Sequence, residues 1–468
     1  MYLALSLPLL LAVRAAAADP FSAAAFVLAD RLTECSFSPA LGFFPAEQLW
    51  QSGATIETLS NVLLAAPPPR LGSALQAALA ASFAKTPVIV DNCFDDHQWW
   101  GLGWARAFLS SSNASYLNRS AAVFDFIAQR GWEETRCGGG VTWCPPPTGP
   151  YKNAITTELF ISLALALHPY AALLGKPPSF YSAWGAKAWA WLDASGMQNA
   201  QGLLNDGLDG ATCANNGQTT WTYNQGVLLS GLLRLSSATS NPAPTAALQR
   251  IANATMSLLT LDGILTEPCP GGTCGSDGQI FKGMFVKHLA YALAEGRALL
   301  DPAFVATARS FFSANAASLL AQDSCRDGGF GFRWDGSECD VESVATDSAA
   351  LDLLLACAAA GCAPPTPPPT YSLLGLGNCI DAAGASMPNC YKDSITLQAC
   401  RDAAFVTPGA VGFDFHMECL GLGQGFCRVR TLAGEGACGG GFSYGSGAGV
   451  AVTEGDGSAL TACYAKAA

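Results

Sequence analysis

About a dozen Ala- and Leu-rich segments with helical spacing constrain the fold of this chain more than any other feature. Several of them carry apolar residues three and four positions apart, which is the pattern of a helix with one buried face. Loops rich in Gly, Pro and Asn separate the segments. The expected helices span residues 20–34, 55–64, 72–85, 95–110, 117–131, 154–168, 179–195, 221–237, 243–260, 279–299, 302–321 and 344–359.

No strong alternation of apolar and polar residues competes with these helices, so this part of the chain is predicted to be all-α. Helices of this length joined by medium loops form antiparallel pairs. The number of segments fits six hairpins in a closed toroid, an (α/α)6 barrel, although periodicity alone does not separate this fold from another helical array. The irregular spacing between segments argues against a strict solenoid repeat.

The composition narrows the class of partner. The 468 residues are 50% hydrophobic and only 13% charged, with a net charge of −12. This apolar fraction suffices for a large core and excludes disorder as the main state. The acidic balance and the lack of Lys/Arg runs argue against a nucleic-acid or anionic-membrane partner. An uncharged polar substrate such as a sugar is compatible with it.

The N-terminus resembles a secretory signal peptide. Residues 3–13 are apolar, and an Ala-rich stretch follows that ends at Ala18. We therefore expect residues 1–18 to be removed. The apolar run is too short to span a membrane, and no later stretch reaches 18 apolar residues without a charge, Gly or Pro. The mature protein is expected to be soluble and extracellular, in the medium or the cell wall.

The cysteines support the same compartment. There are eighteen, without a C-x-x-C or an H-E-x-x-H pattern, and only four histidines. Disulfides in an oxidising compartment explain them better than metal sites, so no metal ligands are predicted. Three N-x-S/T sequons, at Asn113, Asn118 and Asn253, fit a secreted glycoprotein.

A Pro-rich run at residues 363–370 marks a predicted domain boundary, because it behaves as a stiff extended spacer. Residues 19–362 are predicted to form the helical domain. Residues 371–468 hold seven of the cysteines and are predicted to form a small disulfide-stapled module. The cysteine count is odd on both sides, so either a bridge joins the two parts or one thiol stays free in each. A carbohydrate-binding role for the module is a hypothesis.

The most unusual stretch contains Asp95 and Asp96, followed by Trp99, Trp100 and Trp104 at the head of an expected helix. The two acids have a purely structural interpretation, as an N-cap and a first-turn residue that the helix dipole favours. The tryptophans, which Gly101 and Gly103 interrupt, suggest instead a flat apolar surface on which a sugar stacks.

Glycosidase chemistry explains why two acids would lie side by side. A retaining enzyme needs an ionised nucleophile and a protonated acid about 5–5.5 Å apart. Repulsion between the carboxylates and burial against tryptophan both raise a pKa, while the helix N-terminus opposes them. Consecutive side chains diverge by ~100° on a regular helix, so the pair works only where the backbone enters the helix from a loop.

Six segments in series now resemble the glycoside hydrolase family 76 α-1,6-mannanases and their fungal cell-wall relatives, over roughly residues 20–360. The segments are Glu47–Gly53, Asp95–Trp100, Leu204–Gly207, Thr222–Gly226, Ile280–Phe285 and Gly331–Gly336. The resemblance implies an (α/α)6 barrel that retains configuration at mannose. It also implies that the first residue of an adjacent Asp pair is the nucleophile and the second the acid/base, here Asp95 and Asp96.

The sequence departs from the family pattern in a few places. His97 follows the acid pair, Gly101 and Gly103 stand where relatives commonly have Ala, and Asn205 stands where an aromatic residue is common. These departures bear on substrate fit more than on mechanism.

Eight further residues are candidate substrate contacts, each with a structural alternative. Asp206 could bind sugar hydroxyls or form a turn, the amides that open the next helix could read hydroxyls or cap it, and Lys282 could be a solvated cation. The tryptophans could be stacking surfaces or core. The full set is Trp99, Trp100, Asp206, Tyr223, Asn224, Gln225, Lys282 and Trp334.

The sequence thus predicts a secreted endo-acting α-mannan hydrolase that needs no organic cofactor. Its predicted partner is a mannan-like polysaccharide or oligosaccharide substrate. One alternative is transglycosylation, in which a sugar hydroxyl replaces water. A second is a lectin-like or structural glycoprotein. Other motifs fit less well: Gly441–Gly445 matches a nucleophile elbow but no histidine follows it. The acidic loop at residues 335–342 departs from calcium-loop spacing. The sequence does not determine linkage preference or oligomeric state.

Overall fold

The structure is a computed structural model. It describes residues 19–88, 93–145, 151–269, 274–322, 325, 329–336, 339–362, 371–376, 378–380, 389–395, 400, 410–416, 425–431, 443–445, 454–455 and 461–466. The predicted signal peptide, the Pro-rich run and residues 441–442 of the Gly441–Gly445 motif lie outside these residues.

Twelve α-helices lie among the described residues. They are α1 Pro20–Arg31, α2 Leu49–Leu64, α3 Pro69–Lys85, α4 Phe94–Ser111, α5 Ala114–Arg130, α6 Ala154–Leu167, α7 Phe180–Ala194, α8 Thr222–Thr239, α9 Ala243–Leu258, α10 Gly275–Glu295, α11 Pro302–Gln322 and α12 Val344–Ala360. A π-helical turn, η1 Leu32–Ser36, extends α1, and a 3-10 turn, η2 His168–Tyr170, extends α6. Each predicted segment coincides with one helix.

Helix α2 differs most from its predicted start, since it begins at Leu49 rather than near residue 55. Gly53 has the appearance of a loop residue in the sequence, yet it lies inside the helix. Its Cα faces the ring of Trp100, and an added Cβ would come within 2.9 Å of that ring. Tertiary packing thus explains a glycine that local propensity would place in a turn.

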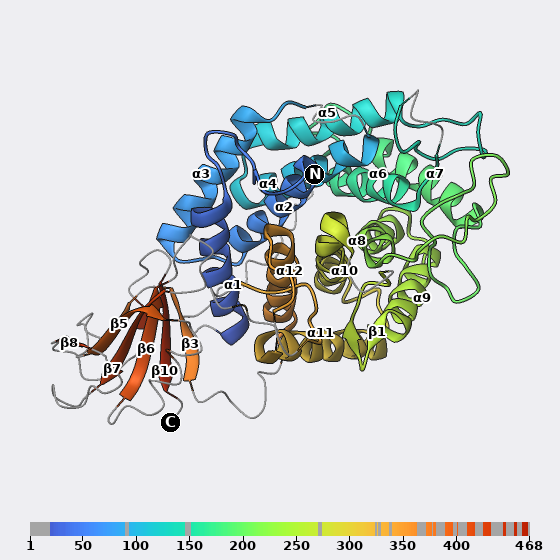
Figure 1. The fold of residues 1–468 in the computed structure, drawn as a ribbon. Helices are drawn as coiled ribbons and strands as arrows, with labels where there is room; N and C mark the ends of the chain where they lie inside the picture. The colour runs from blue at the N-terminus through green and yellow to red at the C-terminus, as the bar shows by residue number, and fades with distance from the viewer. Residues whose placement is uncertain are drawn as a thin grey trace.

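The helices form two concentric layers (Figure 1). Helices α2, α4, α6, α8, α10 and α12 contact one another in that order, and α12 returns to α2 to close the ring. Helices α1, α3, α5, α7, α9 and α11 pack around them. Burial follows the layers: nearly all of α6 is buried, whereas α3 buries one stripe. The predicted (α/α)6 barrel is confirmed.

The inner helices approach one another closely at glycines. A Cβ on Gly226 of α8 would lie 2.3 Å from the Cα of Phe285 on α10. A Cβ on Gly103 of α4 would lie 2.8 Å from the carbonyl oxygen of Gly53 on α2. These glycines set the spacing of the inner ring, because any side chain there would push the backbones apart.

The described residues after the Pro-rich run form strands. They are β3 Tyr371–Leu376, β4 Cys379–Ile380, β5 Asn389–Ile395, β6 Ala410–His416, β7 Gly425–Thr431, β8 Ser443–Gly445, β9 Glu454–Gly455 and β10 Thr461–Lys466. Six of them make an antiparallel sheet in the order β3-β10-β6-β7-β5-β8, and β4 pairs with β9. Strand β3 lies against α1 of the barrel. A short hairpin, β1 Thr260–Leu261 and β2 Ile264–Leu265, follows α9.

Disulfides tie the loops of the barrel. Five pair cysteines before the Pro-rich run, namely Cys93–Cys144, Cys137–Cys213, Cys269–Cys274, Cys325–Cys339 and Cys357–Cys362. Cys35 is also disulfide-bonded. Because the other ten cysteines of this part pair among themselves, its partner lies after the run. A sixth bridge, Cys379–Cys463, joins β4 to β10.

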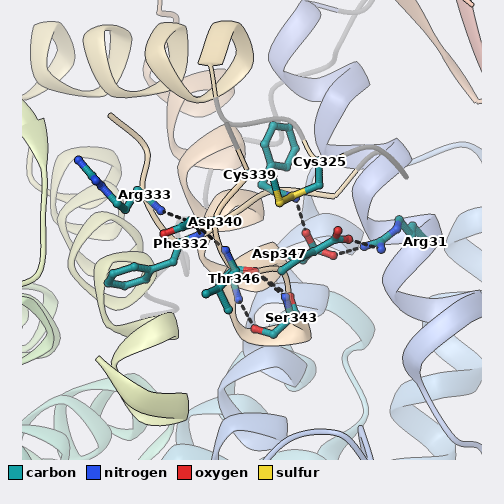
Figure 2. Close-up of a disulfide and its surroundings, with 12 residues drawn as sticks. Arg31, Cys325, Phe332, Arg333, Cys339, Asp340, Ser343, Thr346 and Asp347 are labelled. Carbon is teal, nitrogen blue, oxygen red and sulfur yellow. Dashed lines mark hydrogen bonds and ion pairs between the residues drawn. A yellow bond between two sulfur atoms is a disulfide. The ribbon is translucent and has the colours of Figure 1, made fainter. Parts of the chain in front are cut away.

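Figure 2 shows the Cys325–Cys339 bridge beside an ion pair between Arg31 of α1 and Asp347 of α12. Arg31 also pairs with Glu342, and Asp340 accepts backbone N–H groups of Phe332 and Arg333. These acids of the 335–342 loop therefore have partners within the protein. The loop and its bridge fix the start of α12 against α1.

Two observations bear on the predicted location of the protein. All three sequon asparagines, Asn113, Asn118 and Asn253, are exposed, and Asn113 caps α5 by accepting the N–H of Ser115 at 3.0 Å. Over the described residues, none of the helices combines the length and the apolarity that crossing a membrane requires.

Candidate active site

The first turns of the six inner helices meet at one end of the ring. Gln48, ahead of α2, donates to Ser276 at the start of α10, and Ser343, ahead of α12, donates to Gln279. The N–H of Ala154 at the start of α6 donates to the carbonyl of Asp206 in the loop before α8. Six helix N-termini thus surround this end, which their dipoles make favourable for negative charge.

Asp95 and Asp96 lie in the first turn of α4. A carboxylate oxygen of each lies within 4.8 Å of the other. The two side chains therefore do not point into separate environments, despite the ~100° between consecutive positions of a helix. The sulfur of Cys93 also lies near the pair, but it is bonded to Cys144, so the group offers only two carboxylates as ligands or reactants.

The side chain of Asp95 is anchored on one side. Its Oδ2 accepts the indole N–H of Trp143 at 3.0 Å, while its Oδ1 is buried and has no hydrogen-bond partner. Burial raises the pKa of Asp95 to about 7, although the Trp143 donor and backbone N–H groups of the first turn act to lower it. The predicted nucleophile is thus the carboxyl whose proton burial retains near neutral pH.

An aromatic cluster lies beside the acid pair. Tyr223 of α8 stacks on Phe281 of α10 at 3.8 Å between ring centroids and on Trp99 of α4 at 6.4 Å. Trp50 of α2 contacts both Trp99 and Phe281, at 5.5 and 6.4 Å. Trp50, Trp99 and Phe281 are at least nine-tenths buried, so these three rings offer no open face to a ligand.

Four carboxyl groups surround the Tyr223 hydroxyl. Burial raises the pKa of Tyr223, and the charges of Asp206, Asp95, Glu158 and Asp277 raise it further. The four acids come from the loop before α8 and from α4, α6 and α10. The geometry therefore brings predicted site residues from distant segments into one acidic centre.

Asp206 is held by its loop and by a neighbouring tyrosine. The hydroxyl of Tyr151 donates to its Oδ2, and Asn216 donates to that hydroxyl at 2.8 Å. Burial raises the pKa of Asp206, while the donors Tyr151 and Asn224 act to lower it. Asn205, the unusual neighbour, bonds to Gln218 and Asn215 and so braces the loop.

The two predicted amides of α8 differ. Both side-chain atoms of Gln225 are used within the protein, bonding the backbone of Leu204 at 2.8 Å twice and the carbonyl of Trp221 at 3.0 Å. Gln225 therefore positions the Asp206 loop. Asn224 is fully buried, and neither its Oδ1 nor its Nδ2 makes a hydrogen bond of normal geometry.

The predicted contacts at Trp100, Trp334 and Lys282 are replaced by internal ones. Trp100 is fully buried and donates to the carbonyl of Leu49 at 3.0 Å. Trp334 is fully buried, and the Lys282 ammonium lies 4.6 Å from its ring centroid. Lys282 also donates to the carbonyl of Phe332. Neither ring has an exposed face for a sugar, and the cation holds the 330–336 loop instead of extending into solvent.

The glycines between the tryptophans are also explained by packing inside the protein. Gly103 allows α4 to contact the backbone of α2, and an added Cβ on Gly101 would meet Leu163 of α6 at 2.8 Å. They leave room for neighbouring helices, not for a ligand, so the expectation of a cleared backbone is wrong. His97 is buried, and its Nδ1 lies 2.6 Å from the carbonyl of Cys93.

Sequence reasoning missed several residues of this centre. Glu158 is a lone acid within the apolar stretch Ala154–Leu167, and this isolation is a signal that could have identified it. It is fully buried with no hydrogen bond to either oxygen, and burial together with the charge of Asp206 raises its pKa well above the usual range. Trp143 and Tyr151 lie in a loop without a comparable signal.

A closed ring of helix pairs with two neighbouring carboxyls at its acidic end is the arrangement expected of a glycoside hydrolase of the (α/α)6 class. The sequence places it more closely. Residues 22–367 match the model of glycosyl hydrolase family 76, so the chain belongs to that family.

Individual relatives agree with this assignment. A putative mannan endo-1,6-alpha-mannosidase of Schizosaccharomyces pombe is 27% identical over 317 residues, covering 62% of this chain and 69% of that protein. The mannan endo-1,6-alpha-mannosidase DCW1 of Candida glabrata is 25% identical over 319 residues, covering 63% and 66%.

Solved structures share the fold. An inactive variant of the α-1,6-mannanase GH76A of Salegentibacter sp. HEL1_6, in complex with α-1,6-mannotriose, aligns with a TM-score of 0.62 at 18% identity, over 72% of this chain and 99% of that one. Dfg5 from Chaetomium thermophilum, in complex with glucosamine, aligns with a TM-score of 0.60 at 19% identity, over 74% and 91%. At these identities the likeness concerns the fold alone.

Proposed function

We propose that this chain is a secreted, retaining endo-α-1,6-mannanase acting on mannan or mannose-rich glycans. The observation that supports it most is the approach of Asp95 and Asp96 to within 4.8 Å at the ring end where the helix N-termini meet. The names of the relatives supply the linkage, and the bound mannotriose of a family member supports the class of substrate.

In the proposed first step, the Asp95 carboxylate attacks the anomeric carbon, and the glycosidic C–O bond breaks as Asp96 gives its proton to the leaving oxygen. The product is a glycosyl–aspartate ester. In the second step, Asp96 takes a proton from water, the water oxygen bonds to the anomeric carbon, and Asp95 leaves as a carboxylate. Two inversions at the same carbon retain its configuration.

The surroundings of Asp95 fit a nucleophile that needs help to ionise. Its Oδ1 is buried without a hydrogen bond, and its Oδ2 accepts the Trp143 N–H. Donation to a carboxylate stabilises the charged form, and burial opposes it. The reaction requires Asp95 ionised and Asp96 protonated, so the pair must share a single proton in the active form.

The test is turnover of linear α-1,6-mannan by the purified full chain, with products resolved by anomer. Wild-type protein is expected to release α-configured mannose oligomers, and Asp95→Asn and Asp96→Asn to lose activity by at least about a thousandfold, since two-step catalysis fails without either group. Asp193→Asn, at an exposed position of α7, is the matched control. Full activity in either site variant would refute the assignment of that residue.

The same experiment separates the alternatives. Added mannose oligomers that accept the glycosyl group in place of water would indicate transglycosylation. Tight binding of mannan without turnover by wild-type protein would favour a lectin-like glycoprotein. Inverted products would exclude the covalent mechanism, because a single displacement inverts the anomeric carbon.

The processing and domain assignments belong to the proposal as well. We expect the secreted protein to begin at Asp19, which N-terminal sequencing would show. Treatment with an N-glycanase should lower its mass if the exposed sequons carry glycans. Residues 371–468 are proposed to bind carbohydrate, and substitution of aromatic residues there should weaken retention on insoluble mannan without changing turnover of short oligosaccharides.

A further inference from the structure

Trp143, which the sequence did not single out, lies where the acid pair meets solvent. Its backbone N–H donates to the carbonyl of Tyr151 at 2.8 Å, and its carbonyl accepts the N–H of Phe94 at 2.7 Å. Phe94 is the first residue of α4. The N–H groups of the first turn of a helix have no partner within the helix. The next residue, Cys144, is bonded to Cys93, the N-cap of the same helix. The backbone of Trp143 is thus fixed to the helix that carries Asp95.

The side chain combines an anchored edge with an open surface. Its Nε1 donates to Asp95 Oδ2 at 3.0 Å, and its ring meets Tyr151 edge-on at 6.1 Å. Trp143 nevertheless remains 38% exposed. It is the only aromatic among the exposed large hydrophobic residues of the described chain, while Trp99, Trp100 and Trp334 are buried.

Two consequences follow from this geometry. A donor fixed on Oδ2 holds the carboxyl plane of Asp95 and favours its charged form. The exposed part of an indole anchored beside the reacting carboxylate offers an apolar surface to the C–H face of a sugar ring.

We infer that Trp143 is a positioning residue for Asp95 and that its exposed ring also stacks on one sugar unit of the substrate, a specificity contact beside the point of cleavage. The Cys93–Cys144 bridge keeps the indole in place. This inference rests on the proposed function, since it assigns a surface for the same glycan and a partner for the same nucleophile.

Two substitutions separate the two roles. Trp143→Phe keeps an aromatic face but removes the N–H that stabilises the charged carboxylate. The acid limb of the pH profile of kcat/KM should therefore shift upward by about one pH unit, while KM changes less than about twofold. Trp143→Ala removes the face as well and should raise KM a further ~5–10-fold, the worth of one aromatic contact. A shifted pH profile and a raised KM both differ from the effect of unfolding, which would lower the amount of active protein and leave these two quantities unchanged.

Trp191→Phe is the matched control, because Trp191 is half-buried and its indole N–H bonds a backbone carbonyl, that of Cys137, at 2.8 Å. It should leave the pH profile and KM unchanged. A Trp143→Phe profile that superimposes on wild type would overturn the positioning role. Equal KM values for Trp143→Phe and Trp143→Ala would overturn the stacking role.

The fluorescence of Trp143 keeps the test independent of turnover. The emission of wild type minus that of Trp143→Phe should titrate with Asp95, and this titration should disappear in Asp95→Asn. If wild-type protein does not cleave mannan, the proposed function fails, and the fluorescence titration still decides the positioning role. A flat difference signal between pH 5 and 9 would refute it.

Discussion

Substitution of Lys287 should show what closes the helical ring. Its ammonium nitrogen, on α10, lies 3.5 Å from Glu57 Oε2 of α2 and 3.3 Å from Asp352 Oδ2 of α12. It also donates to Thr58 Oγ1 at 3.1 Å and to the carbonyl of Ala54 at 3.3 Å. Helices α2 and α12 are the first and last of the inner ring, so one cation joins the two ends of the barrel.

Each group in this cluster depends on the others. The Lys287 side chain is 1% exposed, that of Glu57 3% and that of Asp352 0%. Burial raises the pKa of Asp352 to about 7, against the lowering effect of Lys287. Burial also acts to raise the pKa of Glu57, but Lys287 and other nearby cations outweigh it and hold the pKa below its usual value. Removal of the cation leaves two buried carboxyls that have lost their shared ion-pair partner.

We expect Lys287→Met, which keeps the length of the side chain, to lower the free energy of unfolding at pH 8 by about 3–5 kcal/mol. Burial raises the pKa of Asp352 to about 7 even beside Lys287, so without the cation its folded-state pKa lies further above the unfolded one. Stability is then lost as pH rises through that range, so the deficit should be smaller at pH 5 than at pH 8. Urea unfolding monitored by near-UV circular dichroism at both pH values measures it.

Two further variants sharpen this test. The double variant Lys287→Met/Glu57→Gln removes one charge of each sign and should lose less than the sum of its single variants. Lys85→Met, at an exposed position of α3, should stay within about 0.5 kcal/mol of wild type. A deficit below about 1 kcal/mol, or one that does not depend on pH, would refute the reasoning.

Three more outcomes are expected. The value of kcat/KM should fall as pH drops below about 7, because burial raises the pKa of Asp95 to about 7 and the nucleophile must be ionised; an activity that stays constant down to pH 5 would contradict this. Glu158→Gln should be more stable than wild type at pH 9 in thermal unfolding, since burial raises the pKa of Glu158 and the folded state loses stability as that group ionises; equal melting curves at pH 9 would count against it. Gly226→Ala should cost about 1–3 kcal/mol or more in urea unfolding, because its Cβ would lie 2.3 Å from the Cα of Phe285, whereas Gly210→Ala, with nothing within 4 Å, should be nearly neutral.

The helices of the barrel could be predicted because their evidence is local. Apolar spacing near 3.6 residues and loops rich in Gly, Pro and Asn predicted all twelve helices. The strands after residue 370 were not predicted individually. Their pairing order, β3-β10-β6-β7-β5-β8, joins residues as far apart as Tyr371 and Lys466, and short Gly- and Cys-rich strands carry little alternation.

The candidate site was predictable only in part. Asp95 and Asp96 are neighbours in the chain, so the pair could be recognised and its local entry into a helix anticipated. Which tryptophan faces the solvent could not be, because Trp100 and Trp143 differ in exposure only through the helices and loops that pack around them. Gln225 also appeared free to bind a hydroxyl until the loop at Leu204 was seen to occupy it.

The sequence by itself determined the number and approximate positions of the helices, the adjacency of the two acids and the family. The tertiary structure alone decided which side chains surround those acids. Asp206, Glu158, Asp277 and Trp143 come from four segments that only ring closure brings to one end, and burial there, a property of the assembled fold, raises the pKa of the three acids. Local periodicity specifies helices, whereas proximity between distant segments arises only when the helices pack.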